Sequence, residues 1–216
     1  MDVFPDREPD PLSLSRDRVV ERIATAERWD GIRTNDKGRG DDDLNPGLIY
    51  DGPLRPAAVL VPLIDRDEGL TILLTVRTED LARHAGQISF PGGRTDPDDP
   101  HAEATALREA EEEIGLAPRH VEIIGRLDNY FVRTGFLVTP VVGLVTPPFD
   151  IQPDDSEVAE VFEVPLSFIM DPANHERGEM MYKGMPRAFH AMPYGDYYIW
   201  GATAGMLRNL YELLAD

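Results

Sequence analysis

The 216-residue sequence contains no cysteine, which excludes disulfide bonds and thiolate metal sites. It also lacks an uninterrupted apolar run of the ~18 residues that a membrane-spanning helix needs. The first residues, Met1–Asp6, have neither the basic start nor the apolar stretch of a signal peptide. We therefore expect a cytoplasmic protein that has no membrane partner.

Positive charge is scarce in this chain. Lys and Arg number 21 against 40 Asp and Glu, which gives a net charge of −19. Binding to nucleic acid requires lysines and arginines that neutralise the backbone phosphates, so we expect no nucleic-acid partner. An acidic protein that handles a phosphorylated small molecule needs bound cations to offset the repulsion.

The length suggests one domain preceded by an extension. Residues 1–50 are predicted to be this N-terminal extension, with a helix over about 13–29 followed by a loop rich in glycine and aspartate. Residues 51–216 are predicted to form the main domain. The acid run Asp41–Asp43 is interpreted as a solvated turn rather than a metal site, because no predicted helix or strand anchors it.

Hydrophobic periodicity from residue 56 onward predicts more strands than helices. The order of these elements is irregular, which favours an α+β fold with a mixed sheet flanked by helices over repeating βαβ units. Strands are predicted over 57–63, 70–76, 88–90, 121–127, 136–145 and 160–164, and helices over 102–114 and 203–214.

Three glutamates share one face of the helix predicted over 102–114. At about 100° per residue, Glu109, Glu112 and Glu113 form one acidic face, whereas Glu111 points away. Folding gives no reason to group like charges, but a hard cation such as Mg²⁺ does, because it takes oxygen ligands. Arg108 is suited to hold the carboxylates by hydrogen bonds. The alternative is a solvated glutamate face on a surface helix.

Adjacent glycines precede this helix in the stretch Phe90–Gly93, where they permit close approach of the backbone to a metal or phosphate. The stretch Gly93–Leu116 resembles the Nudix box, and the half from Arg108 to Leu116 matches the pattern of that box at every position. The first half differs, because the loop of residues 94–100 is one residue longer than the common pattern. Asp96 and Asp99 therefore receive no assigned role.

A second resemblance concerns one branch of the Nudix family. The stretches Leu73–Arg77 and Leu81–Gly93 are similar to the signature of the coenzyme A pyrophosphatase branch, and Trp200–Leu207 resembles its C-terminal helix. Thr78-Glu79 and Ala82 depart from the residues usual in that signature. The resemblance implies a Nudix-like α/β/α sandwich with a mixed central sheet.

The same resemblance implies a chemistry. Mg²⁺ or Mn²⁺ ions would be held by Glu109, Glu112, Glu113 and the Gly93 carbonyl, and Arg108 would support catalysis. The reaction would cleave the diphosphate of coenzyme A or acyl-coenzyme A, a small nucleotide substrate, to 3′,5′-ADP and 4′-phosphopantetheine. A homodimer is expected by analogy. The implied substrate-binding residues are Arg77, Arg83, His84 and Gly92.

Three residues are candidates for the general base: Glu112, Glu157 and Glu160. Glu157 and Glu160 belong to a segment for which the alternative interpretation is a solvated turn before a strand. Two other functions compete with coenzyme A hydrolysis. One is hydrolysis of ADP-ribose, dinucleotides or nucleoside triphosphates, and the other is a catalytically silent Nudix module that senses a ligand.

Other polar and aromatic residues give weaker indications of a functional role. His101, His175 and His190 lack the spacing of metal ligands and are interpreted as surface residues. The aromatic side chains Tyr194, Tyr197, Tyr198 and Trp200 favour core packing or a dimer interface over stacking against a base.

Overall fold

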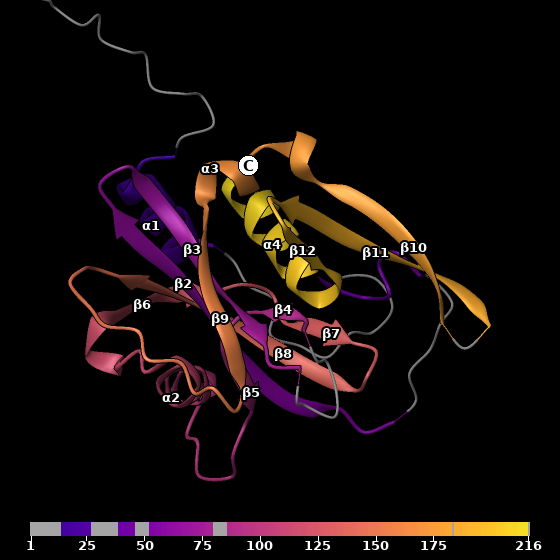
Figure 1. Cartoon of the computed structure of the whole chain (residues 1–216), viewed down its shortest axis with the longest axis horizontal. Coiled ribbons are helices and arrows are strands. Elements are labelled where there is room, and N and C mark those ends of the chain that lie inside the picture. The colour runs from indigo at the N-terminus through magenta and orange to yellow at the C-terminus, as the bar shows by residue number, and fades with distance from the viewer. Residues whose placement is uncertain (1–13, 27–38, 46–51, 80–85, 183, 216) are drawn as a thin grey trace, which may run out of the picture.

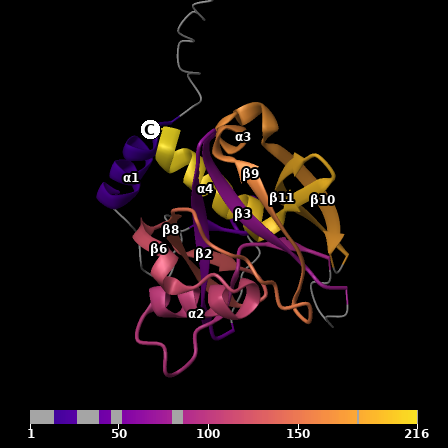
Figure 2. The same ribbon diagram turned by 60° about the vertical axis from the view of Figure 1, so that its left-hand side comes forward.

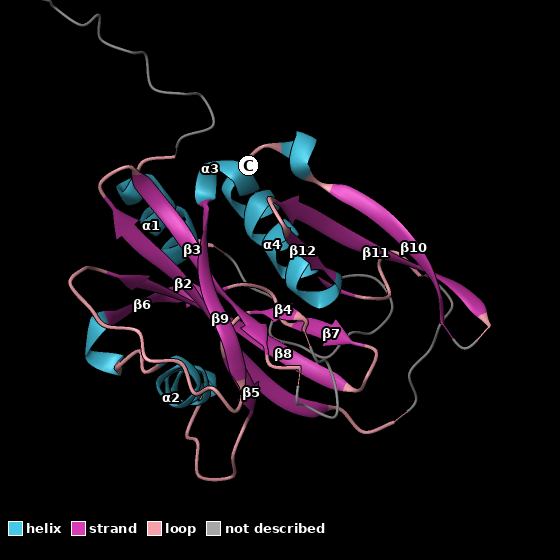
Figure 3. Ribbon diagram, in the orientation of Figure 1, coloured by secondary structure: helices cyan, strands magenta, loops and turns pink. Residues whose placement is uncertain are grey.

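The computed structural model describes residues 14–26, 39–45, 52–79, 86–182 and 184–215. It contains one large mixed sheet with helices on both faces and a smaller antiparallel sheet beside it (Figures 1 and 3). The mixed α+β architecture predicted from the strand and helix pattern is confirmed. No helix in these ranges combines the length and the apolar character that a membrane crossing requires.

Strand β2 (Arg55–Arg66) is the centre of the large sheet. It pairs in parallel with β8 (Phe136–Val145) on one side, and antiparallel with β3 (Gly69–Arg77) and β5 (Gly92–Arg94) on the other. Its side chains are nearly all buried through the middle of the strand, because helices cover both faces of the sheet.

The remaining strands extend the large sheet in both directions from β2. Beyond β8 the order continues through β7 to the short strand β1, and beyond β3 it continues to β4. Two further strands pair outside this path, β6 with β8 and β9 with β3. Their bounds are β1 Arg39–Gly40, β4 Ile88–Ser89, β6 Val121–Arg126, β7 Tyr130–Val132 and β9 Val158–Pro165.

One face of this sheet packs against helix α2 (Ala102–Ile114). The alternation of strand side chains sends Ala58, Leu60 and Leu73 toward that helix, which contributes Ala106, Ala110 and Ile114 to the same cluster. The bounds of α2 agree with the predicted helix, and Gly115 ends it in the left-handed conformation.

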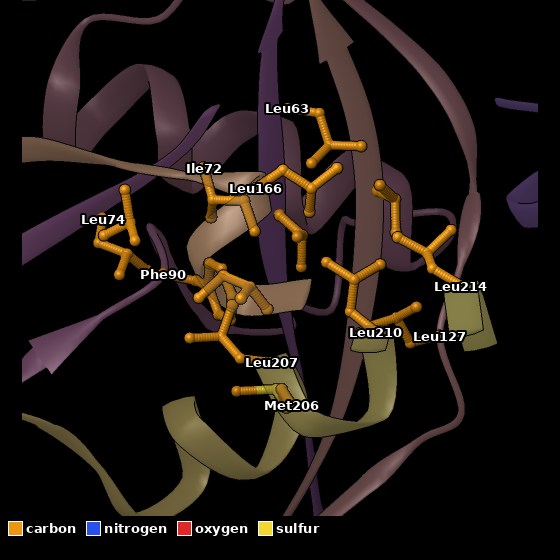
Figure 4. Close-up of a cluster of buried hydrophobic side chains, with 14 of the residues drawn as sticks. Leu63, Ile72, Leu74, Phe90, Leu127, Leu166, Met206, Leu207, Leu210 and Leu214 are labelled. Atoms are coloured by element: carbon orange, nitrogen blue, oxygen red, sulfur yellow. The ribbon is translucent and has the colours of Figure 1, made fainter. Parts of the chain in front are cut away.

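The opposite face packs against helices α1 (Arg16–Thr25) and α4 (Gly201–Ala215), as Figure 2 shows. Figure 4 shows part of this larger cluster, where side chains of α4 meet those of the strands. Labelled there are Leu63, Ile72, Leu74 and Phe90 from the sheet side, and Met206, Leu207, Leu210 and Leu214 from α4.

Helix α1 is part of this second cluster. Ser15 caps the helix by accepting a hydrogen bond from the Arg18 N–H at 3.4 Å, and Val19 and Ile23 are fully buried. The helix is shorter than the predicted span of about 13–29. The described part of residues 1–50 therefore packs on the sheet, although the boundary at residue 50 stays a prediction.

Asp41 lies in a segment that the sequence analysis interpreted as a solvated turn, and this interpretation is wrong for Asp41. Its side chain is buried, pairs with Arg187 and accepts a hydrogen bond from the Arg133 N–H at 3.1 Å. Burial and the nearby Asp41 raise the pKa of Tyr130 well above its ordinary value. The sequence could not indicate this pairing, because Arg187 lies 146 residues away along the chain.

The smaller sheet was not predicted. It joins β10 (Glu176–Tyr182), β11 (Met185–Tyr194) and β12 (Tyr197–Trp200), and it follows helix α3 (Leu166–Met170). Three of the clustered aromatic residues pack on other rings of the chain: Tyr197 stacks on Phe162 at 3.7 Å between ring centroids, Tyr194 meets Phe168, and Trp200 meets Phe189. Two single-turn 3-10 helices complete the fold, η1 at Pro118–His120 and η2 at Pro172–Asn174.

Two of the three histidines predicted to be surface residues are partly buried. His175 hydrogen-bonds the Ile169 carbonyl through Nε2 at 2.8 Å and meets the edge of Tyr211. Burial lowers the pKa of both His175 and His190. The surface interpretation is therefore wrong for these two, whereas His101 is exposed.

The burial of α1 predicts that Ile23→Ala destabilises the whole fold. We expect a loss of about 2–4 kcal/mol in the free energy of unfolding, because the substitution leaves a cavity in the shared cluster. Urea unfolding followed by circular dichroism measures this loss. The control Glu21→Ala, on the exposed side of the same helix, should change stability by less than ~0.5 kcal/mol. An equally small effect of Ile23→Ala would show that α1 unfolds separately.

Candidate active site

Helix α2 is fixed at both ends. The side chain of His101 accepts a hydrogen bond from the Ala104 N–H at 3.2 Å, and Gly115 closes the last turn with a φ of 68°. Ala106 and Ala110 are fully buried against the sheet, which lets the helix approach the strands closely. This packing fixes the rotation of the helix and directs its glutamate face toward β5.

Strand β5 brings two glycines against this face. A Cβ on Gly92, whose φ is 154°, would lie 2.5 Å from the Ala58 carbonyl oxygen. A Cβ on Gly93 would lie 2.5 Å from the carboxylate of Glu109. Gly92 therefore excludes a side chain, whereas a side chain at Gly93 would displace the Glu109 carboxylate. The Gly92 N–H donates a hydrogen bond to Glu113 Oε2 at 3.0 Å.

Arg108 connects two of the glutamates. Its Nη1 donates to Glu109 Oε1 at 3.0 Å and to Glu112 Oε2 at 2.9 Å. Its Nε and Nη2 contact both oxygens of Asp99 at 3.2 and 2.9 Å. The planar guanidinium thus fixes the direction of both glutamate side chains, because it is itself held at two points.

Asp99 is a site residue that the sequence analysis left without a role. Its side chain is only 8% exposed, and it also accepts hydrogen bonds from the Thr105 hydroxyl and the Asp96 N–H, both at 2.9 Å. The Arg108 guanidinium holds the pKa of Asp99 well below its usual range. The longer loop of residues 94–100 therefore still delivers a carboxylate to Arg108. The residue spacing of the motif gave no indication of this contact.

Glu113 is the most buried carboxylate of the group, at 4% exposure. Burial raises its pKa to about 7, although the Gly92 N–H and Arg77 both favour the charged form. Burial also raises the pKa of Glu109, and the neighbouring Glu112 and Glu157 add to that rise. The protein environment therefore disfavours the charged forms of these two carboxyls, and the two arginines of the site, Arg77 and Arg108, do not fully offset this effect.

Arg77 reaches the group from the end of β3. Its Nη1 lies 3.5 Å from Glu113 Oε1, and its Nη2 lies 3.9 Å from Glu157 Oε2. Backbone hydrogen bonds hold this position, since the Arg77 N–H donates to the Gln87 carbonyl at 2.9 Å and the Thr78 N–H donates to the Glu157 carbonyl at 3.0 Å. Arg77 thus joins the carboxylates of the helix to a glutamate of the loop before β9.

Glu157 and Glu160 lie on different sides of the large sheet. Along β9, Val158 and Val161 pack in the cluster on the α2 face, whereas Phe162 packs in the cluster on the opposite face. Glu160 is on the Phe162 side of the strand, where it accepts a hydrogen bond from the Tyr197 hydroxyl. The structure thus brings Glu157 to the helix glutamates and directs Glu160 away from them.

The donor set fits a hard divalent cation, because its ligands would be carboxylate oxygens next to a glycine carbonyl. Within the described ranges, no three carboxylate or imidazole side chains already form a group that could hold a metal ion. Arg108, Arg77 and the Gly92 N–H contact the three glutamates instead. The implied substrate residues Arg83 and His84 lie outside the described residues.

Comparison with known proteins identifies relatives of this chain. The NUDIX domain family matches residues 53–183, which include α2, β5 and Arg77. A curated protein described as the uncharacterized Nudix hydrolase NudL, from Yersinia pestis (strain Pestoides F), is 39% identical over 172 residues, covering 80% of this chain and 86% of the relative. The crystal structure of the Nudix hydrolase RenU from M. smegmatis is 19% identical, with a TM-score of 0.50, covering 76% of this chain and 88% of that chain. The similarity to RenU shows a shared fold only.

The buried Glu113 predicts a pH-dependent stability when divalent cations are removed with EDTA. Its pKa of about 7 in the folded state exceeds the ordinary value of 4.5, so the folded state binds the proton more tightly. Stability should therefore fall as pH rises through this window. Glu113→Gln removes the ionisation, so its free energy of unfolding should fall less between about pH 5 and pH 7.5.

Urea unfolding at the two pH values measures this difference. The matched control is Glu111→Gln on the exposed side of α2, which should follow the wild type. Identical pH dependence in the two variants would contradict the assignment to Glu113.

Proposed function

The chain belongs to the Nudix hydrolase family, whose members act on phosphorus-containing anhydrides, and from this premise we propose that it hydrolyses the diphosphate of coenzyme A or acyl-coenzyme A. The products are 3′,5′-ADP and 4′-phosphopantetheine or its acyl form. The observation that carries this proposal is the position of the segment that resembles the coenzyme A branch. Two of its residues, Arg77 and Gly92, contact the buried Glu113.

The two halves of that segment also form one structural unit. β3 and β4 pair antiparallel, with Thr75 opposite Ser89 and a hydrogen bond from the Thr75 hydroxyl to the Ser89 carbonyl at 3.1 Å. The Gly86 N–H donates to the Arg77 carbonyl at 3.1 Å, which closes the segment beside the carboxylates. Arg77 and Gly92, which belong to the described part of this signature, adjoin the carboxylates and are suited to select the substrate, and this supports the coenzyme A assignment.

Nudix hydrolases use divalent metal ions, and we assign Mg²⁺ or Mn²⁺ to Glu109, Glu112, Glu113 and the Gly93 carbonyl. When bound, such an ion polarises the phosphoryl oxygens and offsets the negative charge that develops on them. The excess of acidic groups supports this assignment, because five carboxyls of the site, those of Asp99, Glu109, Glu112, Glu113 and Glu157, are contacted by only two arginines, Arg77 and Arg108. The close approach of Gly93 to Glu109 supports the inclusion of its carbonyl.

The remaining residues of the site position these ligands. Asp99 orients Arg108, and Arg108 orients Glu109 and Glu112 through the hydrogen bonds described above. In this proposal Glu157 is the general base that takes a proton from the attacking water. The side chain of Glu157 is 49% exposed, so water reaches it, and it lies beside Arg77. Glu160 instead accepts a hydrogen bond from Tyr197 on the other face of the sheet.

The two loop glutamates provide a matched test of the general base. Glu157→Gln should lower kcat by roughly a hundredfold or more, because general-base catalysis contributes about that much. Glu160→Gln should leave kcat within about threefold of the wild type, because its side chain faces away from the reacting group. Steady-state kinetics of both variants with the same substrate measures the difference. A large loss in Glu160→Gln alone would contradict the assignment, and no loss in either would favour Glu112.

A substrate panel tests the proposed function itself. With Mg²⁺ or Mn²⁺, the wild type should hydrolyse coenzyme A with a higher kcat/KM than ADP-ribose, NADH or any deoxynucleoside triphosphate. Separation of the products should give 3′,5′-ADP from coenzyme A. If ADP-ribose, a dinucleotide or a triphosphate is preferred, the family activity stands and the coenzyme A assignment is wrong.

A further inference from the structure

Two arginines close to the site differ from the other cations around it. Arg77 and Arg108 are each held by carboxylates of the site. Arg55 and Arg94 have no carboxylate within ion-pair distance among the described residues, although the chain carries 40 acidic residues against 21 basic ones. Two neighbouring cations of this kind, placed close to the carboxylates, are suited to bind an external anion.

Both guanidinium groups lie over the ring of Phe136. The Cζ atom of Arg55 is 4.0 Å from the ring centroid, and the Cζ atom of Arg94 is 5.4 Å from it. The strand register sets this arrangement, because Arg55 lies opposite Phe136 in the parallel pair of β2 and β8. Arg55 Nη2 donates a hydrogen bond to the Thr134 carbonyl at 2.6 Å, and the other guanidinium donors of the two residues have no hydrogen-bond acceptor among the described residues. We refer to Arg55 and Arg94 as the arginine pair.

The arginine pair lies across a single strand from the carboxylate group, by which we mean Glu109, Glu112 and Glu113. Arg94 follows Gly93 directly in β5, and its backbone carbonyl accepts a hydrogen bond from Arg108 Nη2 at 3.2 Å. Side chains of a strand alternate between its faces. Gly93 therefore faces Glu109 on the α2 side, whereas Arg94 lies opposite Ala57 on the other side of the sheet. A ligand that binds the carboxylate group through a metal needs to cross only the edge of β5 to reach the arginine pair.

We propose that the arginine pair binds the ribose phosphomonoester of a coenzyme A substrate, which is separated from the diphosphate by one sugar. This inference rests on the proposed function and assigns specificity within it. A phosphomonoester is an anion with three terminal oxygens, and arginine binds such a group through two parallel hydrogen bonds. Arg77 is less suited to this role, because Glu113 and Glu157 already surround it.

The test compares coenzyme A with dephospho-coenzyme A, which lacks only this phosphate. For the wild type, kcat/KM should be at least about tenfold higher for coenzyme A, because a hydrogen bond to a charged group contributes roughly that factor. Arg94→Ala should lower kcat/KM for coenzyme A by about tenfold, mainly through KM, and should leave dephospho-coenzyme A within about twofold. Arg94→Lys retains the charge without the two-point contact and should fall between the wild type and Arg94→Ala.

The control variant is Arg119→Ala, which removes the same charge from the exposed 3-10 helix η1. It should affect the two substrates equally and only slightly. A thermal melting curve for each variant shows that the fold is retained.

The outcomes distinguish this inference from the proposed function. If the wild type cleaves both substrates equally well, or if Arg94→Ala lowers both rates equally, the arginine pair does not bind the phosphomonoester, while hydrolysis of coenzyme A stands. If the wild type cleaves neither substrate but does cleave ADP-ribose, the proposed function fails, and this inference fails with it.

Discussion

The candidate site depends on one buried carboxylate, Glu113, held between a helix and a strand. Its hydrogen bond from the Gly92 N–H ties α2 to β5. Because Ala110, one turn earlier, is fully buried, the helix cannot turn Glu113 toward solvent without opening the core. Its raised pKa expresses the cost of this position. The packing of the helix therefore keeps this carboxyl buried beside Glu109 and Glu157, where a bound cation would favour its charged form.

Arginines placed between the carboxylates reduce the repulsion among them. Asp99 holds Arg108, which separates Glu109 from Glu112, and Arg77 lies between Glu113 and Glu157. Each arginine neutralises part of the group and also fixes the direction of the carboxylates that it contacts. The arginine pair on the other side of β5 takes no part in this compensation. Strand β5 thus separates the proposed metal ligands from the arginine pair.

The parts of the site that the sequence could predict are those set by local periodicity. The bounds of α2, its glutamate face and its glycine end follow from the helical repeat and from Gly115. The contact of Asp99 with Arg108 could not be predicted, because the loop of residues 94–100 is one residue longer than in the common pattern. The choice between Glu157 and Glu160 required the face of β9, which long-range pairing with β3 decides. The ion pair of Asp41 with Arg187 was missed because it joins distant parts of the chain. The sheet of β10 to β12 consists of neighbouring hairpins, and it was missed because the side chains of β10 are mostly exposed and show no apolar alternation.

The two faces of the sheet also differ in which segments support them. The face with the carboxylate group is covered by α2, which lies wholly inside the matched range 53–183. The opposite face is covered by α1 and α4, which lie outside that range, yet Ile23 and Leu210 belong to the same cluster as Tyr130 and Val138 of β7 and β8. Phe136, which positions the arginine pair, packs against this cluster. The flanking helices therefore share a cluster with Phe136 of the arginine side, whereas the carboxylate side packs on α2, which lies within the matched range.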